Sequence, residues 1–148
     1  LILIFFYLFF IVYKMYSYHP YQNIYFNSIF SKNVKNINEK FEIDYWGLSG
    51  KKALNYILSL EKNSNSVSIG VASYLQLDKS KKLLNKKDRE KIKIVGQEYE
   101  KADYIYTNFM SEVDKKYNDK YNIPKSFSKI ETFKMDNILV YEIYKKNK

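Results

Sequence analysis

Residues 67–72 read VSIGVA, and this stretch decides the fold because a helical pattern comes directly before it. Apolar residues alternate with small ones in it, as they do in a β-strand, and the turn-rich sequence NSNS at residues 63–66 separates it from what precedes. Apolar side chains recur at helical spacing behind Ser49, which is a good helix cap. We therefore predict a helix over residues 50–62 followed by a strand, the beginning of an α/β fold.

Two further strands are expected downstream. Residues 92–95 (IKIV) and residues 104–108 (YIYTN) have strand-like composition. Between the first and second strands, we predict one short helix within residues 78–91, centred on Leu83 and Leu84.

The end of the sequence indicates a β-hairpin. Residues 129–133 and 138–144 are separated by Met135-Asp136-Asn137, and Asp and Asn tolerate the left-handed backbone of a tight turn. Residues 112–122 are polar and interrupted by Tyr, which favours an exposed excursion that ends at Pro124. The expected fold class is α/β, a small mixed sheet of about five strands with two or three helices, in a single soluble domain over residues 18–148.

The first thirteen residues are apolar or aromatic and run into Lys14. A membrane-spanning helix takes about 20 such residues, and this run starts at the first residue of the sequence, so we interpret residues 1–17 as the end of a transmembrane helix. A signal anchor and a buried segment of a soluble protein are the two alternatives. Tyr13, Tyr16 and Tyr18 fit the aromatic belt of a membrane surface, and residues 18–40 are interpreted as an ordered loop near it.

Composition excludes several chemistries. The sequence has no Cys and one His, so it offers neither disulfides nor a thiolate or multi-histidine metal site. Its four glycines, Gly47, Gly50, Gly70 and Gly96, are too dispersed for a nucleotide-binding loop. His19 is the only candidate base for a triad, and because it precedes Pro20 beside the apolar run, we expect a structural hydrogen bond or an interfacial role for it.

The formal net charge is +9, and part of the excess is local. A basic surface of this kind suits anionic lipid, a phosphorylated substrate or a solvated face, and because no DNA or RNA motif accompanies it, we expect no nucleic-acid partner. We define the basic cluster as the six cations Lys79, Lys81, Lys82, Lys86, Lys87 and Arg89.

Residues 41–49 (FEIDYWGLS) alternate briefly and carry two further candidates. Glu42 and Asp44 would share a face of an extended segment, where they could hold a divalent ion, share a proton or, as we expect, pair with local Lys. Tyr45 and Trp46 could stack on a sugar or lie among lipid headgroups, and packing beneath the helix that follows Ser49 is the simplest expectation.

Two stretches together exceed chance expectation: residues 19–27 (HPYQNIYFN) and residues 41–49, followed by Lys52, Ala53 and Leu54. They resemble the start of the C-terminal soluble region in bacterial polytopic glycosyltransferases related to the dolichyl-phosphate-mannose protein mannosyltransferases and the lipid A aminoarabinose transferases. Residues 102–108 and the closing hairpin are similar to that region too, so the resemblance covers nearly the whole chain. The residues that carry it are His19, Pro20, Tyr21, Tyr25, Asn27, Glu42, Asp44, Tyr45, Trp46, Gly47 and Ser49.

The resemblance implies a function for the longer protein rather than for this segment. In such enzymes a bundle of transmembrane helices binds a polyprenyl-phosphate sugar donor, and an acidic residue on an early external loop assists transfer; neither is in this sequence. The resemblance implies no catalytic, cofactor-binding or metal-binding residue here, a segment inactive alone, and membrane lipids and an upstream transmembrane bundle as partners. It also implies an extracytoplasmic location, whereas the positive-inside tendency of a +9 segment would favour the cytoplasm; we follow the motifs because large domains often ignore that tendency.

We carry three hypotheses forward. The first is the C-terminal extracytoplasmic domain of an integral membrane glycosyltransferase. The second is a membrane-anchored, non-enzymatic binding module that holds anionic lipid or polysaccharide with the basic cluster. The third is a structural lid without a ligand.

Overall fold

The computed structural model describes residues 2–24, 41–110 and 119–147. Tyr25 and Asn27, and most of the excursion expected over residues 112–122, lie outside the described residues. The chain forms two compact units, Leu1–Ile43 and Asp44–Lys148, and each is described by itself.

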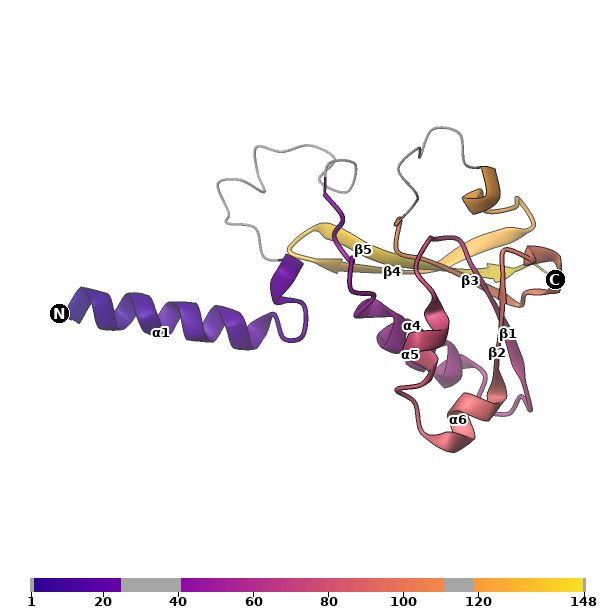
Figure 1. Cartoon of the computed structure of the whole chain (residues 1–148), viewed down its shortest axis with the longest axis horizontal. Helices are drawn as coiled ribbons and strands as arrows, with labels where there is room; N and C mark the ends of the chain where they lie inside the picture. The colour runs from indigo at the N-terminus through magenta and orange to yellow at the C-terminus, as the bar shows by residue number, and fades with distance from the viewer. Residues whose placement is uncertain (1, 25–40, 111–118, 148) are drawn as a thin grey trace. The chain divides into compact units, whose positions relative to one another are not determined.

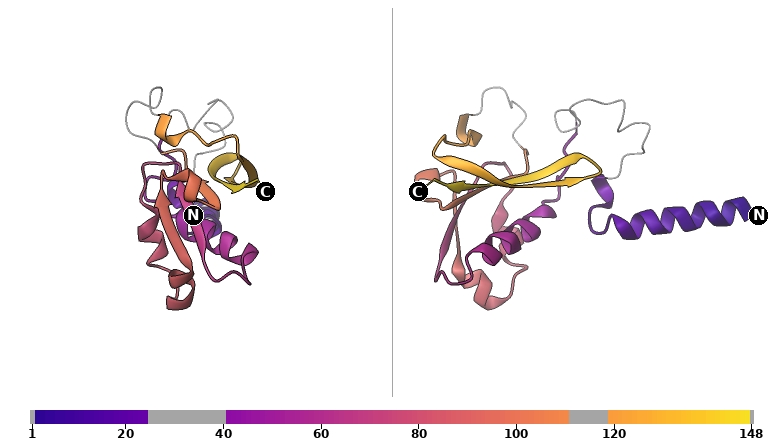
Figure 2. Two further views of the ribbon diagram at one scale, coloured as in Figure 1. Left: turned by 90° about the vertical axis from the view of Figure 1, so that its right-hand side faces the viewer. Right: turned by 180° about the vertical axis from the view of Figure 1, so that it is seen from behind.

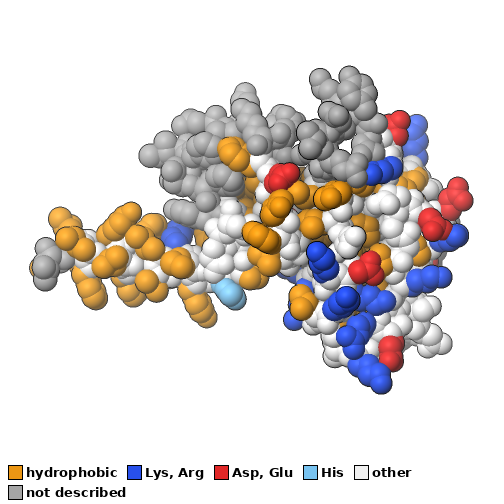
Figure 3. All heavy atoms as spheres, in the orientation of Figure 1, with side chains coloured by type: hydrophobic (Ala, Val, Ile, Leu, Met, Phe, Trp, Pro, Cys, Tyr) orange, Lys and Arg blue, Asp and Glu red, His pale blue; other side chains and the backbone are white. Residues whose placement is uncertain are grey.

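In its described residues the first unit contains helix α1 (Ile2–Ser17) and the 3₁₀ turn η1 (Gln22–Ile24). Hydrophobic side chains cover α1 on the face seen in Figure 3, and none of its residues is buried. Among the described residues, no helix combines the length and the apolar character that crossing a membrane requires. The interpretation of residues 1–17 as the end of a transmembrane helix therefore stays a prediction.

The second unit is built on a five-stranded mixed sheet with strand order β2-β1-β3-β5-β4 (Figure 1). Strand β1 pairs in parallel with both β2 and β3, whereas β5 pairs antiparallel with β3 and β4. The bounds of the strands are β1 Val67–Val71, β2 Ile92–Gly96, β3 Tyr104–Thr107, β4 Phe127–Met135 and β5 Ile138–Lys146.

Helix α4 (Ser49–Leu60) lies against the sheet face that carries Tyr104 and Tyr106. The Tyr106 hydroxyl lies 2.6 Å from Ser49 Oγ at the start of the helix, and the Tyr104 hydroxyl donates to Glu61 Oε1 at 2.6 Å just past its end. Between these anchors, Ala53, Leu54 and Ile57 are fully buried, as their helical spacing predicts. This layer of helix on sheet is the main core of the unit.

The opposite face of the sheet holds a smaller cluster of Ala72, Ala102, Ile105 and Phe127. Tyr99, in the 3₁₀ turn η2 (Tyr99–Lys101), packs against this cluster, and a Cβ on Gly70 would come within 2.9 Å of the Tyr99 ring. A second 3₁₀ turn on the way to β4 is η4 (Asp119–Tyr121). Both faces of the parallel strands are therefore covered, which is usual for a parallel sheet.

Two short helices replace the one expected over residues 78–91. They are α5 (Leu77–Lys81) and α6 (Lys86–Lys91), and Leu83 and Leu84 lie in the turn between them rather than at a helix centre. The reason is Asn85, whose side chain accepts a hydrogen bond from the Asp88 N–H and so starts a new helix. The prediction of a single helix was wrong on this point.

The closing hairpin is confirmed. Its turn residues Asp136 and Asn137 have φ of 44° and 68°, the left-handed values expected from their types. Strands β4 and β5 pair along their whole length to form this hairpin, which Figure 2 shows from behind. The described residues of the second unit thus form a five-stranded mixed sheet with the three helices α4, α5 and α6, which is the mixed α/β fold that the sequence predicts. Helix α1 belongs to the first unit.

Candidate functional site

A buried hydrogen-bond network joins the loop before α4 to the end of β3. Its centre is Asp44, which has no solvent exposure. The Asp44 carboxylate accepts from Ser49 Oγ at 2.6 Å, from the Ser49 N–H at 3.3 Å and from Asn108 Nδ2 at 3.0 Å. A fully buried carboxyl is tolerated only when its lone pairs are met in this way.

Tyr106 extends the network toward the surface. Its hydroxyl lies 2.6 Å from Ser49 Oγ and 3.4 Å from Asp44 Oδ2. Because Ser49 has one hydroxyl proton and donates it to Asp44, the Tyr106 hydroxyl donates to Ser49. The three side chains form a continuous chain of hydrogen bonds.

The turn after β3 completes the network. The Asn108 amide also donates to the Asp44 carbonyl at 3.4 Å, and its own oxygen accepts from the Met110 N–H at 3.4 Å. Between them, Phe109 has φ of 61°, an uncommon conformation for a bulky residue. The chain is held in this turn because Thr107 Oγ1 accepts from the Phe109 N–H and donates to the Ala72 carbonyl.

Burial dominates the electrostatics of Asp44. It raises the pKa of the carboxyl above its ordinary value, because desolvation disfavours the charged form, while hydrogen bonds from Ser49, Asn108 and the backbone of Leu48 partly oppose the rise. The carboxyl is inaccessible to solvent, so we interpret it as a structural group rather than a reagent.

Three sequence predictions about this loop are wrong. Residues 43–46 form a turn rather than an extended segment, so Glu42 is exposed while Asp44 is buried, and they do not share a face. Asp44 bonds neutral Ser, Tyr and Asn side chains instead of local Lys. Ser49 is the first residue of α4 and does not cap it; its N–H donates to Asp44, which therefore supplies the cap.

Above this network lies a small, shallow hollow of about 30 Å³. We call it the edge hollow, because it lies at the carboxyl ends of the parallel strands. Trp46 and Gly47 contribute from the loop before α4, Gln76 and Lys79 from the segment after β1, and Tyr106 from β3; the full lining is Trp46, Gly47, Gly50, Leu75, Gln76, Leu77, Lys79, Ser80 and Tyr106.

The strand order makes this edge a topological switch point. The chain leaves β1 toward β2 on one side and leaves β3 toward β5 and β4 on the other. In open α/β sheets ligands bind outside the carboxyl ends of strands at such a point. Gly47, with φ of 64°, turns the chain here. A Cβ on Gly50 would collide with Ser80 of α5, so a glycine at this position lets α4 and α5 approach.

Tyr45 and Trp46 point to solvent. They are 53% and 73% exposed and contact each other edge to face, with ring centroids 5.1 Å apart. The expectation that they pack beneath α4 is therefore wrong, because the Gly47 turn directs them outward. Contact with a sugar or with lipid headgroups stays open for both.

The basic cluster lies on α5, on α6 and in the turn between them, and Figure 3 shows Lys and Arg side chains gathered over these helices. All six side chains are exposed except Lys81, which is half-buried. Lys79 alone also lines the edge hollow.

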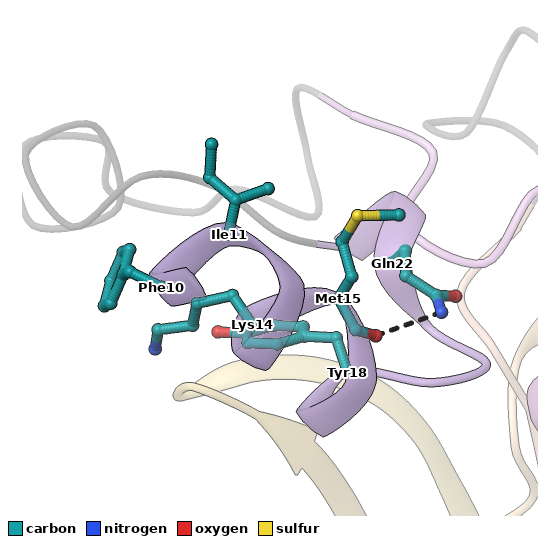
Figure 4. Close-up of a pocket in the computed structure, with 6 residues that line it drawn as sticks. All are labelled: Phe10, Ile11, Lys14, Met15, Tyr18 and Gln22. Atoms are coloured by element: carbon teal, nitrogen blue, oxygen red, sulfur yellow. Dashed lines mark hydrogen bonds between the residues drawn. The ribbon is translucent and has the colours of Figure 1, made fainter. Parts of the chain in front are cut away.

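The end of α1 carries a second, apolar hollow of about 140 Å³, shown in Figure 4. Its lining residues are Phe10, Ile11, Lys14, Met15, Tyr18 and Gln22. The Lys14 ammonium lies 5.8 Å from the centre of the Phe10 ring and 5.6 Å from that of Tyr18, an arrangement in which a cation and aromatic rings attract.

His19 makes the structural hydrogen bond that the sequence predicts. Its Nδ1 lies 3.0 Å from Gln22 Nε2, which also donates to the Met15 carbonyl at 3.1 Å. The His19–Pro20 peptide bond is cis, Pro20 is exposed and Tyr21 is buried.

Sequence reasoning missed Tyr106, Asn108 and Gln76 as site residues. Polar residues directly after a parallel strand were the available signal for Asn108, since such positions gather at the carboxyl edge. Gln76 had no such signal. In the part of the chain that the structure describes, no three His, Cys, Asp or Glu side chains gather as around a metal ion.

These features define an α/β domain with a small, shallow hollow at its switch point. Comparison with protein-family models, with curated proteins and with solved structures found no match.

Proposed function

We propose that this chain is the C-terminal, extracytoplasmic domain of an integral membrane glycosyltransferase that takes a sugar from a polyprenyl-phosphate donor. The catalytic groups belong to the transmembrane bundle of the longer protein, and this domain serves the acceptor side of the reaction. The chain by itself transfers no sugar.

One observation carries this proposal. Two of the stretches that resemble such enzymes, the motif at residues 41–49 and the additional similarity at residues 102–108, are more than fifty positions apart in sequence. In the fold they meet in one buried network, in which Asp44 and Ser49 from the first bond Tyr106 and Asn108 from the second. If this chain is such a domain, stretches that resemble the family in separate parts of the sequence are expected to contact one another in the fold, as these two do.

Helix α1 supports the membrane part of the proposal. Its apolar side chains are exposed on all sides, with Phe5, Leu8 and Phe9 each more than half exposed. A helix that is hydrophobic all round is stable in lipid or in a protein core, and the first unit buries none of α1. Lys14 and the Tyr residues near it suit the headgroup region.

The test is sugar transfer in membranes. Membranes from cells that lack the gene for the complete protein should lose transfer of radiolabelled sugar from a polyprenyl-phosphate donor, and the intact gene should restore it. The chain of residues 1–148, expressed alone in the deleted cells, should not. Unchanged transfer in the deletion strain would overturn the proposal, and transfer by the chain alone would overturn the assignment of catalysis to the bundle.

The basic cluster favours a second candidate, a non-enzymatic module that binds anionic lipid or polysaccharide. Five exposed cations on two short helices and in the turn between them make a surface that anionic vesicles attract in a salt-dependent way. Reversing Lys82, Lys86 and Lys87 to Glu should then abolish binding to phosphatidylglycerol vesicles. Reversing Lys62, Lys125 and Lys134, which are equally exposed elsewhere, changes the net charge by the same amount and should have little effect. Equal losses in both variants would show that only net charge matters.

A further inference from the structure

We propose that the edge hollow binds one pyranose ring of an oligosaccharide, with Trp46 as the stacking surface and Gln76 and Lys79 as the hydrogen-bonding groups. The inference deepens the proposed function, and rests on it for the biological role of the sugar, because it places an acceptor-binding site on this domain.

Trp46 is the first reason. Among the described residues of the second unit, it is the most exposed large hydrophobic side chain, with 73% of its surface in solvent. Its loop is held in place, since Asp44, two residues earlier, is the centre of the buried network and Gly47 has the left-handed backbone that turns the chain. An indole fixed at the rim of a hollow offers a rigid flat surface of the kind that contacts the apolar face of a sugar ring.

The polar groups beside Trp46 match a sugar better than an anion. Gln76 offers both a donor and an acceptor, and Lys79 offers donors, so sugar hydroxyls can be met in both roles. The amide groups at the start of α4, which would otherwise attract a phosphate, already donate to Asp44 from Ser49 and Leu48. The hollow therefore favours a neutral, hydroxyl-rich ligand.

The place of the hollow agrees with this choice. At about 30 Å³ it is too small to enclose a ligand, since enclosing pockets run from roughly 300 Å³ upward, so the ring lies across its mouth against Trp46 rather than inside it. It lies at the switch point between β1 and β3, where α/β sheets bind ligands. Neither Gln76 nor Lys79 has a side-chain role in capping or ion pairing among the described contacts, so both are free to bind.

The experiment uses the fact that Trp46 is the only tryptophan in the sequence. Its fluorescence in the whole chain, kept in detergent, is titrated with mannotriose, cellotriose and galactotriose, and with inorganic phosphate. A saturable change with at least one trisaccharide, at a Kd of roughly millimolar order, and none with phosphate is the expected result. No change with any trisaccharide would overturn the proposal, and a response to phosphate would point to an anion site instead.

Two pairs of variants test which side chains contact the trisaccharide. Gln76→Ala keeps the reporter and should weaken binding at least fivefold, whereas Lys125→Ala, at an exposed position outside both the hollow and the basic cluster, should stay within twofold. By calorimetry, Trp46→Ala should abolish binding while Tyr45→Ala, the exposed neighbour that does not line the hollow, should retain it. Equal losses at both aromatic positions, or none at Gln76, would contradict the site. Circular dichroism of each variant checks that it is folded.

Two further arms separate the rival explanations. If phosphatidylglycerol vesicles shift the Trp46 emission and trisaccharides do not, the surface contacts lipid and the sugar site is rejected. Binding needs no transfer, so trisaccharide binding without transferase activity in membranes would leave the hollow intact and reject the proposed function. Transferase activity without binding would reject only the hollow.

Discussion

Helices α1 and α4 differ in how much apolar surface they carry and in where they carry it. In α1 the side chains from Ile2 to Val12 are apolar on every side, and none is buried. In α4 the apolar residues Ala53, Leu54 and Ile57 form one stripe that is completely buried, and Lys51, Lys52 and Asn55 face solvent. An apolar stripe on one face is typical of a helix that packs on a sheet, and an apolar surface on every side is typical of a helix in lipid or in a protein core.

The largest expected effect breaks the α4 side of this comparison. Ile57→Ala removes a fully buried side chain from the layer between α4 and the sheet, so it should lower the free energy of unfolding by about 2–5 kcal/mol. Ile4→Ala in α1, where the side chain is 63% exposed, should leave unfolding unchanged. Urea unfolding of the chain in detergent measures both, and similar losses in the two variants would remove the distinction between the helices.

A charged substitution in α1 tests the α1 side of this comparison. If α1 lies in lipid, Phe9→Arg should weaken membrane association by about 2.5–3.5 kcal/mol, the cost of a cation near the centre of a membrane helix. Leu83→Arg, at a 65% exposed position of the second unit, should not change it. Sedimentation with membranes measures the bound fraction, and the same bound fraction for Phe9→Arg as for the unaltered chain would exclude lipid contact at this depth.

The Asp44 network should contribute less than the apolar core but more than a surface ion pair. Asp44→Ala leaves buried donors on Ser49 and Asn108 without an acceptor, so we expect a loss of about 1–3 kcal/mol in the free energy of unfolding. Glu42→Ala, two residues away and exposed, is the matched control and should stay within about 0.5 kcal/mol. A loss at Glu42 equal to that at Asp44 would argue that the loop, not the network, matters.

The smallest effect depends on pH. Hydrogen bonds from Ser64, Tyr104 and Lys145 lower the pKa of Glu61 from 4.5 to about 2, so the folded state binds fewer protons than the unfolded state in that window. The stabilisation is present above pH 4.5 and is lost as the pH falls toward 2. Glu61→Gln should therefore lower stability at neutral pH and match the unaltered chain near pH 2, whereas Glu100→Gln should not. A difference that persists at low pH would assign the effect to packing.

Local patterns predicted most of the fold. All five strands and α4 lie where alternation and helical spacing placed them, and the Asp136-Asn137 turn has the backbone expected of its residues. The exception in the second unit is the pair α5 and α6, where one side-chain cap at Asn85 divided a segment that looked continuous. Such a division depends on a single hydrogen bond, which periodicity does not register.

The site was much less predictable. The short alternation of apolar and polar residues over 41–49 predicts an extended segment. The segment turns instead because Asp44 bonds partners more than fifty residues away, in β3 and in the turn after it, which no local pattern indicates. The same distance explains why Tyr45 and Trp46 were expected to be buried. Because Tyr106 and Asn108 hold Asp44 inside, the turn at residues 43–46 directs Tyr45 and Trp46 outward.

The sequence by itself determined the α/β order, the hairpin, the all-round apolar character of α1 and the basic character of α5 and α6, because each depends on neighbours within a few residues. Only the tertiary structure decided that Asp44 is buried, that Trp46 is exposed, and that Gln76, Lys79 and Tyr106 line one hollow with it. The physical reason is that these positions meet through the parallel pairing of β1 with β3, a contact between segments that no local pattern encodes.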